Sequence, residues 1–306
     1  METAVSNFVE PESKLAVFAA GYFADRITEM GSRHGANVVR LEKPWGETFS
    51  GEEARDFIRR EQPQTVAFVH AETSTGALQP GDAICEAAHE AGALVIADCV
   101  TSLGGVPVQI DKMGVDIAYS CTQKGLSCPP GLAPFTASPR ALEHLRARKR
   151  PNPVWYLDLK LIAEYYDAPH TYHHTAPISS FYALREGLAA IMDEGLENRW
   201  ERHRRCHEQF LKGLSTLGVR MHVAEGKRIL TLNTPRVPEG VNDVQVRQKL
   251  LAEHNIEISG GFGPLAGKIF RIGIMGPLAT EESVAMFLDA FGRVLAEVRE
   301  SATASR

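Results

Sequence analysis

The chain has 306 residues, of which 44% are hydrophobic and 23% charged, and its formal net charge is −5. This composition is typical of a globular protein and predicts one large domain with a smaller one. The charge balance shows no basic stripe, and no apolar run reaches the roughly 18 residues that a membrane span needs. We therefore expect neither nucleic acid nor a membrane as a partner.

Short apolar runs alternate with helical patterns along the first 140 residues. Strands are predicted over residues 15–20, 37–41, 65–70, 93–98 and 116–121, and helices over residues 23–30, 50–62 and 81–91. Ser50 and Glu53, three positions apart, predict a capping box at the start of the second helix. Such alternation indicates an α/β fold with a mainly parallel sheet flanked by helices, in which ligands gather beyond the carboxyl ends of the strands.

The pattern changes after residue 139. Helices are predicted over residues 139–150, 158–166, 179–195, 198–217, 243–255 and 280–299, and strands over residues 228–233, 256–259 and 268–274. We expect a large domain over residues 1–194 and a smaller C-terminal α/β domain over residues 195–306. The short basic run over residues 144–150 is interpreted as a solvated helix end, with a phosphate or partner contact as the alternative.

The cysteines indicate a reducing environment. There are five, an odd number without zinc-site or CxxC spacing, and we expect a cytoplasmic location. The first ten residues carry two acids and lack the basic segment of a signal peptide. Cys121 and Cys128 are interpreted as small buried fillers, with a catalytic cysteine as the less favoured alternative.

Asp98 and Lys124 follow two of the predicted strands. A lysine amine can hold pyridoxal 5'-phosphate (PLP) covalently, and a carboxylate can pair with the pyridine nitrogen and keep the ring an electron sink. Spacing alone is weak evidence, because acid and lysine pairs at strand ends are common in α/β proteins. In the alternatives, Asp98 caps a following helix and Lys124 is an exposed turn residue.

Eight short motifs raise the odds of the PLP interpretation. They are residues 21–26 (GYFADR), 72–76 (ETSTG), 97–105 (ADCVTSLGG), 120–126 (SCTQKGL), 129–131 (PPG), 172–175 (YHHT), 195–200 (GLENRW) and 270–276 (FRIGIMG). In this order they resemble the class V PLP-dependent aminotransferases of fold-type I, specifically the alanine–glyoxylate and serine–pyruvate aminotransferase family. Each motif is weak alone, but together they extend over nearly the whole chain.

The resemblance implies transamination between a small amino acid, alanine or serine, and glyoxylate or pyruvate. A sister transaminase, such as a serine–glyoxylate or ureidoglycine–glyoxylate enzyme, is the main rival among enzymes. The resemblance also implies that Lys124 is catalytic and holds PLP, and that Asp98 pairs with the pyridinium. Phe23 would stack on the ring, with a plain core position as its alternative. Thr73 would bond to the phenolic oxygen or nearby ring atoms, with a plain turn as its alternative, and Gln123 would contact the phosphate.

Three further residues take roles from the resemblance. Tyr172 and Thr175 would reach across a homodimer to the phosphate of the partner's cofactor, although a plain polar loop is the blander interpretation. Arg271 would clamp the substrate carboxylate with two parallel donors, since an arginine inside an apolar strand must face a site or be paired. The neighbouring His173 and His174 are expected to point to opposite faces, so we predict no metal site.

The start of the chain departs from the family pattern. In the family, a Ser-Gly-containing turn opens a helix whose N–H groups hold the PLP phosphate, and Met1 aligns within that helix. The resemblance therefore implies that an N-terminal segment is missing. Either the start has been misassigned in a full enzyme, or the chain is a fragment, or it is a diverged protein without activity, such as a catalytically impaired truncated paralogue acting, if at all, as an interaction subunit. We favour the first explanation, because the expected catalytic positions are intact.

Overall fold

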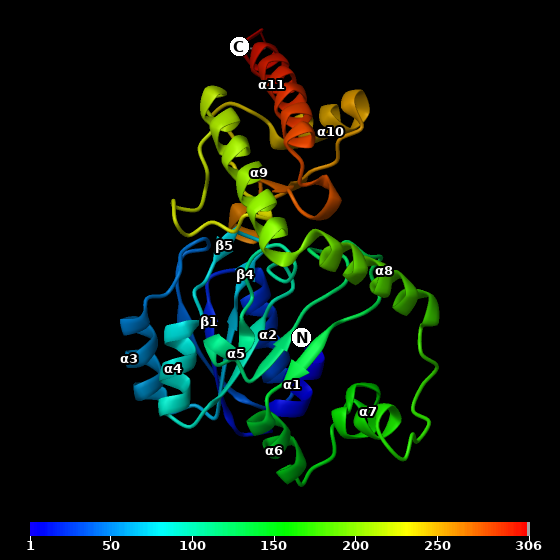
Figure 1. The fold of residues 1–306 in the computed structure, drawn as a ribbon. Helices are drawn as coiled ribbons and strands as arrows, with labels where there is room; N and C mark the ends of the chain where they lie inside the picture. The colour runs from blue at the N-terminus through cyan, green and yellow to red at the C-terminus, as the bar shows by residue number, and fades with distance from the viewer. Residues whose placement is uncertain (305–306) are drawn as a thin grey trace.

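A six-stranded sheet with helices on both faces forms the larger part of the protein in the computed structural model, which describes residues 1–304 (Figure 1). The strand order is β2-β1-β3-β6-β7-β8, and every pair is parallel except β7 with β8. The strands are β1 (Lys14–Ala19), β2 (Asn37–Glu42), β3 (Thr65–Val69), β6 (Leu94–Asp98), β7 (Ile117–Tyr119) and β8 (Phe135–Ala137). This arrangement confirms the predicted α/β fold with a mainly parallel sheet.

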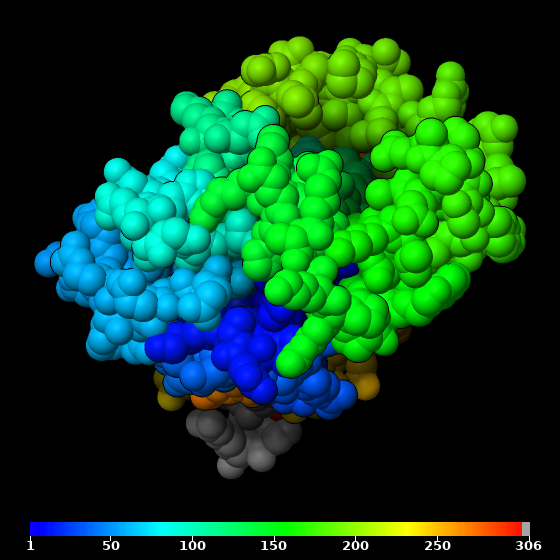
Figure 2. Space-filling view, turned by 90° about the horizontal axis from the view of Figure 1, so that it is seen from below, coloured from blue at the N-terminus to red at the C-terminus, as the bar shows by residue number. Residues whose placement is uncertain are grey.

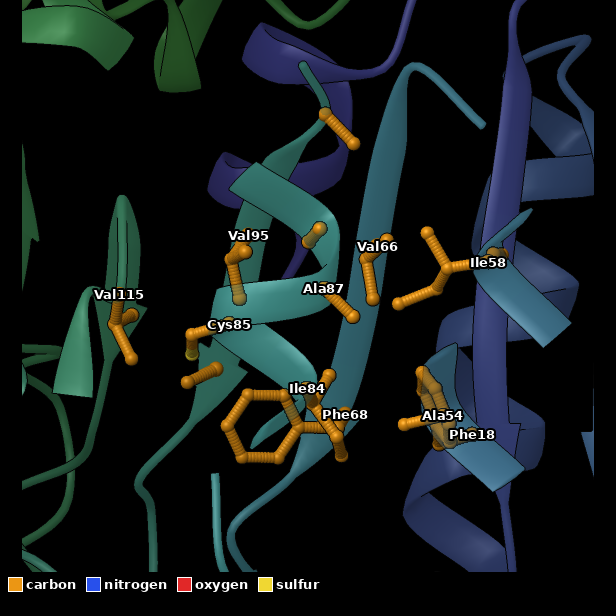
Figure 3. Close-up of a cluster of buried hydrophobic side chains, with 14 of the residues drawn as sticks. Phe18, Ala54, Ile58, Val66, Phe68, Ile84, Cys85, Ala87, Val95 and Val115 are labelled. Carbon is orange, nitrogen blue, oxygen red and sulfur yellow. The ribbon is translucent and has the colours of Figure 1, made fainter. Parts of the chain in front are cut away.

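Both faces of this sheet are buried under helices. The helices are α3 (Gly51–Glu61) and α4 (Asp82–Glu90) on one face, and α1 (Glu2–Phe8), α2 (Tyr22–Arg33) and α6 (Pro139–Ala147) on the other. Successive side chains of a strand point to opposite faces, so Val66 and Phe68 pack toward α3 and α4 (Figure 3). Ala67 of the same strand belongs to the core under α1 and α2. The apolar runs of the sequence therefore supply two cores at once.

The C-terminal part has a core of its own. Its elements are α9 (Leu196–Thr216), α10 (Asp243–His254), α11 (Glu281–Ala304), β9 (Leu232–Asn233), β10 (Ser259–Gly260) and β11 (Phe270–Gly273). Phe210, Phe270 and Phe291 are fully buried between the helices and the small sheet. Gly195, with a φ of +79°, separates α9 from the preceding helix and marks the predicted domain boundary, which stays a prediction.

The remaining elements connect these two parts. They are β4 (Ala71–Glu72), β5 (Ala77–Leu78), α5 (Ile110–Met113), α7 (Leu159–Tyr166), α8 (Ile178–Glu194) and the short 3₁₀ turns η1 (Trp155–Leu157), η2 (Gly263–Leu265) and η3 (Gly276–Leu278). Helices α7 and α8 lie beside the sheet, and Figure 2 shows the green chain around them standing out from the blue N-terminal part. None of the helices within residues 1–304 has both the length and the apolar character that crossing a membrane requires.

Several sequence expectations are corrected here. The strand predicted over residues 256–259 is wrong except at Ser259, because the left-handed Asn255 turns the chain and Ile256 bonds back to the Leu250 carbonyl. The strand predicted over residues 228–233 is reduced to β9. The basic run is not simply solvated, since Arg148 is buried and donates to the Ser6 carbonyl.

The capping box at α3 is confirmed. The Ser50 hydroxyl accepts from the Glu53 N–H, and the Glu53 carboxylate accepts from the Ser50 N–H. These two bonds satisfy helix donors that would otherwise lack partners. The start of α3 is thus defined by local side chains.

Truncation of Phe291 should strongly destabilise the protein. Its ring is fully buried on α11, 5.2 Å from the Phe287 ring and 5.5 Å from the Phe270 ring, centroid to centroid. We expect Phe291→Ala to lower the free energy of unfolding by about 3–5 kcal/mol, measured by urea denaturation. Met286→Ala, on the same helix but 60% exposed, is the control and should change it by less than about 1 kcal/mol. Equal losses in the two variants would contradict this view of α11.

Candidate active site

Polar residues meet where three neighbouring strands end. Asp98 is the last residue of β6 and lies between Val69 of β3 and Tyr119 of β7 in the sheet register. Lys124 follows β7 in a turn that is closed by a bond of 2.9 Å from the Ser127 N–H to the Lys124 carbonyl. Because the carboxyl ends of parallel strands share one sheet edge, residues far apart in sequence are brought together there.

Asp98 is a buried carboxylate with two hydrogen bonds. Its side chain accepts from the Tyr119 hydroxyl and from the Val100 N–H, each at 2.9 Å. Burial raises the pKa of Asp98, and these two bonds and the charges of the Met1 amino group and Arg26 oppose that rise. The alternative that Asp98 caps a helix is wrong, since the Val100 bond closes a turn and no helix begins between Asp98 and the start of α5 at Ile110.

Lys124 carries an amine that lacks a partner. Within the described residues, its Nζ has neither a hydrogen bond nor an ion pair, and its side chain is half-buried. Burial is the main cause of the raised pKa of Cys121, while the charge of Lys124 lowers this pKa and that of Asp98 raises it. Cys121 therefore lies within the fields of both groups. The neighbouring Gln123 is exposed.

Cys121 and Cys128 are both buried, in agreement with the prediction that they are small fillers. All five are free and buried. Burial raises the pKa of Cys85 and of Cys99 to about 12, and it also raises that of Cys121. A thiol in this state is a poor nucleophile, because the thiolate is the reactive form.

Glu72, which the sequence analysis did not single out, connects two predicted site residues. Its carboxylate accepts from the Phe23 N–H at 3.1 Å, and from the Ser74 N–H and hydroxyl at 3.0 and 2.7 Å. It thereby fixes the first turn of α2, which carries Phe23, to the hairpin loop that carries Thr73. A Cβ at Gly21 would lie 2.3 Å from Glu72 Cγ, so the chain needs glycine at that point.

Phe23 and Thr73 lie on the two segments that Glu72 joins. The Phe23 ring packs partly on the core, and the Arg26 guanidinium lies 5.1 Å from its centroid. The hydroxyl of the buried Thr73 has no hydrogen-bond partner within residues 1–304. Their contacts with a ring and a phenolic oxygen stay predictions.

Arg271 reaches this site from β11. Its guanidinium lies 3.8 Å from the centroid of the Phe262 ring, its Nε donates to the Gly260 carbonyl at 2.8 Å, and its Nη1 donates to the Thr73 carbonyl at 3.4 Å. Burial lowers the pKa of Arg271, and the charge of Glu72 raises it. No carboxylate of the described chain forms an ion pair with it, so several of its N–H groups remain available to a ligand.

Tyr172 and Thr175 lie together in the loop before α8, away from these contacts. Their hydroxyls are 3.0 Å apart, and Tyr172 is 73% exposed. The expectation for the histidines between them is wrong, because the Nδ1 atoms of His173 and His174 lie 2.8 Å apart. The segment is irregular and not an extended strand, so neighbouring side chains need not point to opposite faces. The His173 ring stacks on the Trp155 ring, with the two centroids 4.2 Å apart.

The comparisons with known proteins agree with this geometry. The family model for class-V aminotransferases matches residues 1–275. The chain belongs to the class V aminotransferase family. The (S)-ureidoglycine–glyoxylate transaminase of Bacillus subtilis (strain 168) is 37% identical over 313 residues, which cover 96% of this chain and 75% of that protein. The alanine–glyoxylate aminotransferase of Callithrix jacchus is 36% identical over 299 residues, which cover 96% of this chain and 72% of that protein.

A solved structure is still more similar. The alanine–glyoxylate aminotransferase of Nostoc sp. is 47% identical, with a TM-score of 0.95 over 96% of this chain and 78% of that one. Class V aminotransferases are in general PLP enzymes. The site fits that cofactor, since a buried carboxylate, an unpartnered amine and an unpartnered hydroxyl gather at one sheet edge. The resemblance to the family and the predicted fold-type I are thereby confirmed.

Glu72 should make the stability of the protein depend on pH. Burial raises its pKa to about 7, so the folded state keeps this proton at pH values where the unfolded state has lost it. The stabilisation is complete below about pH 4.5 and is lost as the pH rises through about 7, by an amount on the order of 3 kcal/mol. Relative to Glu72→Gln, the wild type should therefore lose unfolding free energy over this range.

The measurement is urea denaturation of both proteins between pH 4.5 and 8. Glu90→Gln, an exposed glutamate on α4, serves as the matched control. A constant difference between wild type and Glu72→Gln across this range would show that the carboxyl group does not titrate as described.

Proposed function

We propose that this protein uses PLP to transfer an amino group between a small amino acid, alanine or serine, and glyoxylate or pyruvate. The observation that carries the proposal is the meeting of the buried Asp98 and the unpartnered Lys124 at one sheet edge. Glyoxylate appears in the names of the relatives from Bacillus subtilis, Callithrix jacchus and Nostoc sp. and therefore supports that acceptor. Because the donors in those names differ, a ureidoglycine–glyoxylate or serine–glyoxylate enzyme is the second candidate.

Five residues would hold the cofactor. Lys124 would bind it covalently through Nζ, Asp98 would face the ring nitrogen, and Phe23 would cover the ring. Thr73 would donate to the phenolic oxygen and Gln123 to the phosphate. When bound, PLP supplies an electron sink for charge that develops at the substrate α-carbon.

The chain's own groups would perform the remaining steps. Asp98, in its buried environment, would be stabilised as an anion by a cationic N–H of the cofactor ring, which it would in turn keep protonated. Arg271 would bind the substrate carboxylate through its remaining N–H groups and so fix the orientation of the α-carbon. Lys124 Nζ would serve as the base that takes the proton from the substrate α-carbon and, once protonated, as the acid that gives a proton back.

We propose that a second copy of the chain completes the site. Support comes from several exposed apolar side chains within residues 155–192, a stretch whose green chain lies at the surface in Figure 2. Trp155, Tyr182 and Met192 are 59%, 67% and 74% exposed there, and large exposed apolar side chains gathered on one segment are typical of interfaces. In a homodimer this surface would bring Tyr172 and Thr175 to the phosphate of the partner's cofactor.

The proposal also includes the division into domains and the cellular location. The separate cores support a cofactor-binding domain over residues 1–194 and a small domain over residues 195–306. The five free cysteines support a cytoplasmic location, where thiols stay reduced.

Removal of the Lys124 amine should abolish covalent cofactor binding. Wild-type protein incubated with PLP and borohydride should yield one labelled peptide, containing Lys124, and Lys124→Ala should yield none. Transamination should fall by at least about 10²–10⁴-fold, because the general base is lost as well. Lys149→Ala, an exposed lysine, is the control. Labelling of another peptide in the wild type would refute the assignment, and a panel of amino donors would separate the candidate substrates.

A mixing experiment tests the contribution of the second copy. Neither Lys124→Ala nor the double variant Tyr172→Phe, Thr175→Ala should be fully active alone. If Tyr172 and Thr175 act across a dimer, each mixed dimer has one intact site, so random exchange should restore up to about a quarter of wild-type activity. Activity no higher than the average of the two unmixed variants would place these hydroxyls in their own subunit's site.

A further inference from the structure

The loops that follow Asp98 and Lys124 both contain glycine, and their backbones are in contact. One loop follows Asp98 and contains Gly104, and the other contains Gly125, directly after Lys124. A Cβ at Gly125 would lie 2.2 Å from the Leu103 carbonyl oxygen, and one at Gly104 would lie 3.0 Å from the Gly125 carbonyl oxygen. The two backbones are thus in direct contact without room for a side chain. Strand pairing ends at Tyr119 and does not extend to the lysine.

One side chain from the C-terminal part spans this contact. Arg199, on the first turn of α9, is 4% exposed. Its Nε donates to the Gly104 carbonyl at 2.8 Å and its Nη2 to the Gly125 carbonyl at 2.7 Å. These two nitrogens form one edge of the guanidinium, so a single planar fork holds one carbonyl from each loop.

The opposite edge of Arg199 is held in turn. Its Nη1 donates to the Glu194 carboxylate at 2.8 Å, and the same carboxylate binds Arg202 at 2.6 and 3.0 Å. The pKa of Glu194 is lowered to about 2, mainly by the hydrogen bond from Arg202. We call Glu194, Arg199 and Arg202 the arginine hub.

The arginine hub also contacts the segment that follows Arg271. Arg202 donates to the Gly276 carbonyl at 3.0 Å, and the Gly276 N–H donates to His203 Nε2 at 3.1 Å. The hub therefore joins the loop after Asp98, the turn after Lys124 and the chain after β11. These three segments follow Asp98, Lys124 and Arg271, the groups on which the proposed chemistry depends.

We propose that Arg199 is a positioning residue that sets the place of Lys124 Nζ relative to Asp98. The inference rests on the proposed role of Lys124. A glycine-flanked turn has much conformational freedom, and a catalytic group displaced by about 1 Å can lose on the order of 10²-fold in rate. The buried guanidinium removes that freedom because both carbonyls must remain within its fork.

A merely structural role, in which Arg199 only anchors α9, makes different predictions. Loss of an anchor would lower the melting temperature and speed amide exchange along α9. Loss of a positioning contact would instead speed exchange in the two loops and leave α9 protected. The two roles are therefore separable in protein without cofactor.

The test compares Arg199→Lys, which keeps the charge but lacks the fork, with Arg204→Met. Arg204 lies on the same helix, is exposed, and among the described residues bonds only to Glu201 and Glu208. For Arg199→Lys we expect faster hydrogen–deuterium exchange in peptides covering residues 101–106 and 122–128, with α9 unchanged. In PLP-loaded protein, kcat should fall about tenfold to a hundredfold with KM for the oxo acid within about twofold of the wild-type value. Arg204→Met should match the wild type in every respect.

A second variant guards against loss of folding. Glu194→Gln weakens the hub from its partly exposed side, so it should show the same pattern at smaller amplitude. Wild-type exchange and kcat in Arg199→Lys, or uniform deprotection including α9 in both hub variants, would overturn the proposal. Borohydride labelling of the wild type in the same series separates the failures. A label at Lys124 with unchanged variants counts against Arg199 alone, whereas no label counts against the proposed function.

Discussion

The site depends on the carboxylate of Asp98, which the fold buries at the carboxyl end of an inner strand of the sheet. Asp98 is 2% exposed, and within residues 1–304 only a hydroxyl and one N–H bind its oxygen atoms. Burial opposes the ionisation of Asp98. A cation placed opposite it would therefore interact with it more strongly than with a carboxylate in water. The register that sets Asp98 between Val69 and Tyr119 prevents it from moving toward solvent. Strand pairing thus keeps this carboxylate buried, where a cationic group of a ligand can stabilise its charge.

A second buried acid nearby shows how environment separates two similar groups. Glu72 accepts three hydrogen bonds from N–H and O–H donors and holds two segments together. Burial raises its pKa to about 7, and the charge of Asp98 contributes to that rise. The two acids disfavour each other's ionisation, so a cation that binds at Asp98 relieves the repulsion as well. Glu72 therefore holds two segments of the structure together, whereas Asp98 remains able to interact with a ligand.

The sequence predicts what local patterns determine. Buried apolar runs locate the parallel strands, and the Ser50 capping box locates the start of α3, because these signals lie within a few residues. It fails at residues 256–259, where apolar side chains pack into the core from a loop. It also gives no sign that Arg271 reaches the Thr73 carbonyl, nearly two hundred residues away. Such contacts follow from how the two parts fit together, which no local pattern encodes.

The way in which the charged residues are held leaves their charges available. Arg271 is fixed by two backbone carbonyls and the face of Phe262, and the carboxylate of Glu72 influences it only through its field. Asp98 is fixed by neutral donors, and Lys124 Nζ has no partner in the described chain. Ion pairs among these groups would satisfy them internally, and a ligand would then have to break those pairs. Neutral contacts instead fix geometry without cancelling charge, so binding energy remains for a dipolar substrate and an anionic cofactor.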